Sequence, residues 1–208
     1  MTCELLQQNG WFLVTLLGTL LVVLLFVHGA QSLISSLGGN DEGRRWVISL
    51  TGCQWKFTLP MFILFSGVLF VSVPQFHATS FGGAYWLWGI IFFSYVWQAL
   101  SYEFRDQFSH LLGANAFQIL LVLNGMVGSV LLGSALATFF EGEFNLWVLV
   151  FGFSVFFLAR ILGILYVKTR VCDADIRSCA SVRLMGSTIA FLVLFVTYLV
   201  HQMMDFLS

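Results

Sequence analysis

Arg160 is the one basic residue that lies inside an apolar stretch, at residues 146–167, seven residues before that stretch ends. A charged side chain at the centre of a membrane helix costs about 2.5–3.5 kcal/mol on insertion scales, so it is a candidate for function. Two interpretations stay open. Arg160 pairs with a buried acid, or with a carboxylate of a cofactor held by another subunit. Alternatively, its long side chain reaches the nearby membrane surface.

A single histidine near the end of the first apolar stretch is the second candidate. His28 is a candidate proton relay or metal ligand. A metal site on one helix face needs another ligand three or four residues on, and Gln31 and Ser32 occupy those positions. A hydrogen-bonded interior histidine is the alternative interpretation. A zinc site built on Cys172 and Cys179 would find only carboxylates nearby, so we predict no metal site.

Residues 102–106, Tyr-Glu-Phe-Arg-Asp, end another apolar stretch. Glu103 lies just past the hydrocarbon and could admit protons from the adjacent aqueous phase. Alternatively, Glu103, Arg105 and Asp106 form a solvated ion-pair cluster that fixes the helix end. No nucleophile–base pair, nucleotide-binding loop or H-E-x-x-H motif occurs, so no independent catalytic site is predicted. The buried amides are expected to make interhelical hydrogen bonds, at Gln98, Gln118 and Asn124.

Six apolar stretches must position these residues. The chain has 208 residues, of which 59% are hydrophobic and 9% charged, whereas soluble domains average about 25% charged. Each stretch has about the 20 residues that cross ~30 Å of hydrocarbon. We therefore predict an all-α polytopic membrane protein, a bundle of six transmembrane helices in the lipid bilayer. The spans cover residues 11–33, 57–75, 80–101, 116–139, 146–167 and 184–204.

The basic residues orient this bundle. All of them except Arg160 fall in three links on one side of the membrane, at 34–56, 102–115 and 168–183. By the positive-inside rule these links are cytoplasmic and both termini lie outside. A net charge of −1 without a basic stripe excludes nucleic acid as a partner. The near-helical spacing of Trp46, Val47 and Leu50 predicts a further helix on the cytoplasmic membrane surface.

Small residues recur at every fourth position of the fourth stretch. They form one smooth ridge on which the backbone of another helix can approach closely. The ridge predicts tight packing, within the bundle or against a partner, and indicates no chemistry. Its members are Gly125, Ser129, Gly133 and Ala137.

Five short motifs follow one another through the first half of the chain. They are Leu37–Arg45 (LGGNDEGRR), Trp55, Gly67–Pro74, Phe81–Tyr85 (FGGAY) and Ser101–Arg105 (SYEFR). Their order and spacing resemble the cytochrome bd quinol oxidase subunit II family. In that family an L-G-x-N-D-x-x-R-R loop precedes a span rich in small residues, an F-S-G-x-Y turn and a closing [SG]-F-[DE]-[FY]-R. The resemblance is strong over about residues 35–107 and topological elsewhere.

This resemblance implies the non-haem-bearing subunit II of a quinol:oxygen oxidoreductase of aerobic respiration, in the bacterial cytoplasmic (inner) membrane. Haem b and haem d are expected in a larger partner, subunit I, and none in this chain. A bound quinone and a small single-span accessory subunit are further candidates that the family allows. The residues expected to serve a proton path or partner contacts are His28, Glu103, Arg105 and Arg160.

Four positions depart from the family pattern. Lys56 stands where many members carry an acid, Thr58 replaces an asparagine, and Gln98 stands where some members have an arginine. His28 stands near an aspartate of many members. A proton path that uses those acids is therefore not expected here, and Glu103 and His28 remain as its candidates.

Members of the family usually have eight spans in two sets of four. The similarity of WFLV at 11–14 to WVLV at 147–150 fits such a repeat. We expect residues 1–140 to form the first four-helix repeat and residues 141–208 a partial second repeat of two helices. The chain is accordingly expected to be a fragment or a truncated form.

A small six-helix transporter or channel is the alternative function. Against it stand the shortage of buried charge and helices that proline and glycine do not break. Both prolines, Pro60 and Pro74, lie near the ends of the second stretch. A membrane assembly factor without catalytic function is a third interpretation.

Overall fold

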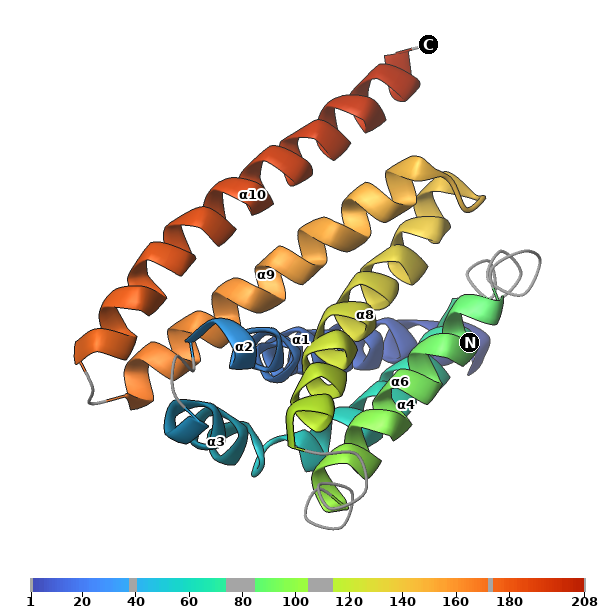
Figure 1. Cartoon of the computed structure of the whole chain (residues 1–208). Coiled ribbons are helices and arrows are strands. Elements are labelled where there is room, and N and C mark those ends of the chain that lie inside the picture. Colours follow the sequence, from blue (N-terminus) through green and yellow to red (C-terminus); the bar gives the residue numbers. More distant parts are fainter. Residues whose placement is uncertain (1, 38–40, 74–84, 105–113, 172–173, 208) are drawn as a thin grey trace.

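The computed structural model describes residues 2–37, 41–73, 85–104, 114–171 and 174–207, and all secondary structure within them is helical (Figure 1). The predicted all-α fold is thus confirmed. The helices are α1 (Thr2–Ser32), α2 (Ile34–Leu37), α3 (Asp41–Thr51), α4 (Trp55–Ser72), α6 (Tyr85–Glu103), α8 (Ala114–Glu141), α9 (Leu146–Arg170) and α10 (Ala174–Leu207).

Five helices are long and apolar enough to cross a membrane, which is typical of a multi-pass membrane protein. They cover Asn9–Ser36, Trp55–Ser72, Phe117–Glu141, Leu146–Arg170 and Arg177–Leu207. Helix α6 occupies the described part of the expected span 80–101, but its many tryptophan and tyrosine residues keep its mean hydropathy below that of the five. The count of six spans and the outward termini therefore stay predictions.

Helix α9 lies at the centre of the helix contacts. It packs against α1, α8 and α10, while α4 packs on α1 and α6 packs on α8. Helices α9 and α10 form an antiparallel hairpin, and α10 packs mainly on α9 (Figure 1). Because α9 contacts helices on both sides of residue 141, the two expected repeats share an extensive interface. The division into repeats stays a prediction.

The helices extend beyond the apolar stretches that predict them. Helix α10 begins at Ala174, ten residues before the expected span, so Arg177 and Arg183 are helical and do not belong to a loop. The expectation of a link through residue 183 was wrong, because hydropathy marks only the apolar part of a helix. Helix α9 begins where the Asn145 side chain accepts a hydrogen bond from the backbone N–H of Val148, at 3.0 Å.

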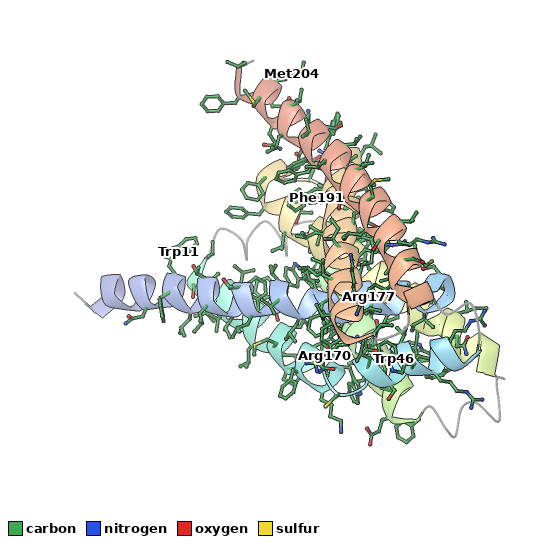
Figure 2. The ribbon with its side chains drawn as sticks, turned by 90° about the vertical axis from the view of Figure 1, so that its left-hand side faces the viewer. Trp11, Trp46, Arg170, Arg177, Phe191 and Met204 are labelled. Carbon is green, nitrogen blue, oxygen red and sulfur yellow. The ribbon has the colours of Figure 1, made fainter. Side chains whose placement is uncertain are left out.

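Basic residues gather at one end of the bundle. Figure 2 shows Arg170 and Arg177, at the turn of the α9–α10 hairpin, on the same side as Trp46 of α3. Trp11 and Met204 lie away from this group, toward the far ends of α1 and α10, which diverge in this view. We call these the basic end and the opposite end. Helix α3 forms where the near-helical spacing predicts it, with Val47 and Ile48 buried against α8 residues.

The small-residue ridge of α8 lies against two different helices. A Cβ atom at Gly125 would lie 2.6 Å from the carbonyl oxygen of His28 in α1. A Cβ atom at Gly133 would lie 2.8 Å from Cβ of Val155 and 3.0 Å from Cα of Gly152, both in α9. The other two members, Ser129 and Ala137, are fully buried.

We expect Gly133→Leu to destabilise the packing of α8 on α9, because a branched side chain has no room there. Overpacking of this kind typically costs about 1–3 kcal/mol. The melting temperature of the purified protein in detergent measures the effect. The matched control is Gly67→Leu, since a Cβ atom at Gly67 meets nothing within 4 Å. Equal melting temperatures for the two variants would contradict the prediction.

Candidate functional site

Buried polar side chains from four helices gather in the half of the bundle toward the basic end. We call this group the polar cluster. Each member is less than a tenth exposed, although it lies in a helix that is otherwise apolar. Such residues in membrane helices are costly unless they serve structure or function. The members are His28 and Gln31 of α1, Thr58 of α4, Ser94 and Gln98 of α6, and Asn124 of α8.

Glycines of α8 bring the polar cluster together. His28 and Gln31 are three residues apart on α1, so they share a helix face. A Cβ atom at Gly128 would lie 3.2 Å from His28 Nε2 and 3.2 Å from Ser94 Oγ. The absence of a side chain at this position therefore lets the imidazole of α1 and the hydroxyl of α6 approach the same point on α8.

A hydrogen-bonded chain leads from the basic end to Gln31. Thr51 Oγ1 of α3 and the hydroxyl of Tyr102 in α6 are 2.8 Å apart, and either can be the donor. Gln31 Nε2 donates to the same Tyr102 oxygen at 3.1 Å. The Tyr102 ring is held in place by stacking on Trp55, with ring centroids 5.6 Å apart. Three helices thus meet at one phenolic oxygen.

The predicted interhelical hydrogen bonds of the amides are confirmed. Asn124 Oδ1 accepts from Ser94 Oγ at 2.7 Å, and Gln98 Oε1 accepts from Thr58 Oγ1 at 3.3 Å. Gln118 Oε1 accepts from the guanidinium of Arg44 at 3.4 Å, which joins α8 to α3. These bonds fix the relative rotation of the helices around His28.

Five buried polar atoms of the polar cluster have no hydrogen-bond partner among the described residues. An unsatisfied buried polar group costs about 1–3 kcal/mol, and ordered water usually satisfies groups that protein atoms do not. Their concentration around His28 is therefore typical of a hydrated interior site. The atoms are Nδ1 and Nε2 of His28, Oε1 of Gln31, Nε2 of Gln98 and Nδ2 of Asn124.

An apolar core closes the bundle beyond the polar cluster. The His28 ring contacts Tyr95, with centroids 4.8 Å apart, and Tyr95 stacks on Phe62 at 4.6 Å. From there toward the opposite end, the buried side chains that α1, α4 and α6 contribute to the described structure are apolar, among them Leu21, Phe65 and Ile91. Polar groups thus continue from the cluster toward the basic end, whereas on α1, α4 and α6 apolar side chains follow it toward the opposite end.

Of the three predicted site residues that the structure describes, one lies in this cluster. His28 lies at its centre. Glu103 is exposed at the end of α6, next in sequence to Tyr102. Arg105 lies outside the described residues. Arg160 is half-buried on α9, where α1 crosses at Gly29, and its Nε atom has no hydrogen-bond partner among the described residues.

A second polar group, at the opposite end, joins α8, α9 and α10. Glu141 accepts hydrogen bonds from Asn145 Nδ2 at 2.8 Å and from Gln202 Nε2. His201 stacks on Trp147 with ring centroids 4.0 Å apart, and its Nε2 lies 3.2 Å from a carboxylate oxygen of Asp205. These contacts fasten α10 to the α8–α9 turn and indicate a structural role.

The model of the cytochrome bd terminal oxidase subunit II family matches residues 6–207. The chain belongs to this family. None of the curated proteins compared with it gave a match. Cytochrome bd is a respiratory oxidase, so this subunit serves oxidoreductase chemistry at the level of the complex, and the numbered subunit implies a subunit I partner. Family membership favours the oxidase interpretation over a transporter or channel.

The two histidines that the structure describes, His28 and His201, are not placed to ligate a haem iron. No group of three or more His, Cys, Asp or Glu residues within the described part of this subunit could hold a metal ion. The His28 ring is packed between Gly128 and Tyr95, which leaves no space for a macrocycle at its Nε2 atom. His201 is stacked face to face on an indole. The cytochrome bd complex contains haem, and its position on either of these two histidines is not expected.

Proposed function

We propose that this chain is the non-haem-bearing subunit II of a cytochrome bd-type quinol:oxygen oxidoreductase in the bacterial cytoplasmic membrane. The observation that carries the proposal is the family match over residues 6–207. In the proposed division of labour, the larger subunit I holds haem b and haem d. The chain acts as a scaffold that supports subunit I in aerobic respiratory electron transfer.

Within that assembly, the polar cluster conducts protons from the cytoplasmic surface into the membrane. Reduction of oxygen to water consumes protons, and these must reach the partner from an aqueous phase. The hydrogen-bonded groups of Thr51, Tyr102 and Gln31 lead from the basic end toward His28. An imidazole accepts a proton at one ring nitrogen while it releases another from the second. Glu103, which is exposed next in sequence to Tyr102, collects protons at the start of this route.

The apolar core gives this route a direction. Beyond Tyr95 and Phe62, the described buried side chains of α1, α4 and α6 include no group that can accept a proton. A proton that reaches His28 from the basic end therefore cannot continue to the opposite face through these helices. We propose that it leaves sideways, toward a neighbouring subunit.

Purification through an affinity tag on this chain tests the proposed function. We expect a second, larger membrane polypeptide to co-purify, together with the absorbance of haem b and haem d and quinol-dependent oxygen consumption. Membranes that express the untagged chain are the control for nonspecific capture. A colourless, monodisperse protein from cells that make cytochrome bd would overturn the proposal and favour a transporter or an assembly factor.

A further inference from the structure

Two arginines, Arg160 of α9 and Arg183 of α10, lie at a similar level of the α9–α10 hairpin. Arg160 lies eleven residues before Val171, and Arg183 lies twelve residues after it, so the antiparallel packing places them at a similar level. Eleven residues of helix correspond to about 17 Å of rise. The neighbouring Leu184 packs against the buried cluster that includes Ile164 and Val167 of α9, and the charge of Arg183 acts on Arg160.

No described carboxylate neutralises this pair. The ion pairs of the described side chains lie at the opposite end, around His201, and neither Arg160 nor Arg183 has an acidic partner among those side chains. Arg177 is different, because its guanidinium donates to the backbone oxygen of Val171 at 2.9 Å. Two cations that repel each other in a medium of low dielectric constant need an anion between them.

Extension of the side chain to the membrane surface can solvate the charge of Arg183 but not that of Arg160. The Cα–Cβ bond of a helical residue tilts toward the N-terminus of its helix. Helix α10 begins at the basic end, so Arg183 tilts toward the headgroups there. Helix α9 begins at the opposite end, so Arg160 tilts away from them. Arg160 therefore depends on an anion that comes to it, and Arg183 is placed to hold that anion from the headgroup side.

We propose that Arg160 and Arg183 together bind the phosphate of an anionic phospholipid of the cytoplasmic leaflet. Guanidinium groups bind phosphate oxygens bidentately, and basic sites between membrane helices on the cytoplasmic side bind anionic headgroups. Further positive charge from Lys168 and Arg170 at the same end of the hairpin attracts such a lipid.

The face of α10 that adjoins Arg183 and points away from α9 has room for acyl chains. A Cβ atom at Gly186, three residues beyond Arg183, would meet nothing within 4 Å. The neighbouring side chains Val182, Met185 and Ile189 are 70%, 65% and 56% exposed. When the two arginines hold the phosphate of a lipid, its acyl chains thus run along α10, toward the middle of the membrane.

Lipid titration of the complex purified through this chain tests the proposal. The delipidated complex receives dioleoyl phosphatidylglycerol or dioleoyl phosphatidylcholine, and native mass spectrometry counts retained lipids while the melting temperature is recorded. We expect phosphatidylglycerol to be retained and to raise the melting temperature, and phosphatidylcholine to do neither. Arg160→Gln with Arg183→Gln should weaken phosphatidylglycerol binding at least about tenfold. The matched control removes two exposed cations elsewhere, Arg45→Gln with Lys56→Gln, and should retain wild-type binding.

Three outcomes would overturn the proposal. Equal retention of both lipids by the wild-type complex excludes an anionic headgroup site, and this comparison needs no variant to fold. An equal rise in melting temperature with inorganic phosphate alone indicates a site for free phosphate. If the double variant keeps phosphatidylglycerol but releases the larger subunit, the arginines hold a carboxylate of that partner.

Discussion

Gly29→Ala is expected to abolish the close packing of α1 on α9 and with it most of the yield of folded protein. A Cβ atom at position 29 would lie 1.8 Å from the carbonyl oxygen of Ala159 and 2.9 Å from the backbone nitrogen of Arg160. Because both are backbone atoms, no change of rotamer relieves the clash, and the helices must separate. We expect a cost at or above the upper end of the ~1–3 kcal/mol typical of overpacking.

Each of the two helices has a glycine at this contact. A Cβ atom at Gly163 of α9 would lie 2.3 Å from the backbone nitrogen of Ala30, so Gly163→Ala should have a comparable effect. The measurement is the yield of monodisperse protein and its melting temperature in detergent. Gly89→Ala is the control, because its Cβ atom meets nothing within 4 Å and alanine favours helix over glycine. Gly29→Ala protein with the melting temperature of the control would refute the proposed crossing.

His28→Leu is expected to lower quinol-dependent oxygen consumption by more than about tenfold while haem absorbance stays unchanged. Leucine preserves apolar packing against Tyr95 and Gly128 but can neither accept nor release a proton. Proton transfer by a positioned side chain contributes typically ~10²–10⁴-fold to a rate. Proton uptake measured on oxygen pulses should slow in parallel. This prediction rests on the proposed proton route.

Two further variants separate proton transfer from packing. His28→Asp restores a proton-carrying group, of the type that many family members have near this position, and should retain activity within a few-fold. Lys56→Ala should do the same, because Lys56 is exposed and its ammonium group lies 5.9 Å from the centre of the Trp55 ring, outside the polar cluster. Full activity of His28→Leu would assign proton delivery to another subunit. Equal losses in His28→Leu and His28→Asp would indicate a packing role.

Hydropathy predicts the apolar part of each long helix, because a helix needs about 20 consecutive apolar residues to cross the hydrocarbon. It misses the first ten residues of α10, where polar and charged side chains lower the hydropathy without ending the helix. For the same reason hydropathy places Arg183 in a link, and the sequence does not predict that it lies at the level of Arg160. The surface helix α3 could be predicted from the sequence, because its apolar and basic residues alternate with a helical period.

The candidate site was predictable only in part. His28 stands out in the sequence because a titratable residue within an apolar stretch is rare. Its surroundings come from α3, α6 and α8, and no local pattern links Thr51, Ser94 or Tyr102 to it. The ridge of α8 is visible because its members repeat within one helix. Gly29 and Gly163 are single glycines on two helices, so only the packed structure shows that they meet.

The contacts of Glu141 have a consequence for biogenesis. Its carboxylate is 6% exposed, and one of its hydrogen-bond donors, Gln202, belongs to the last turns of α10. During synthesis the α8–α9 hairpin therefore enters the bilayer with an incompletely paired acid at its tip. Arrival of the final helix completes that pairing.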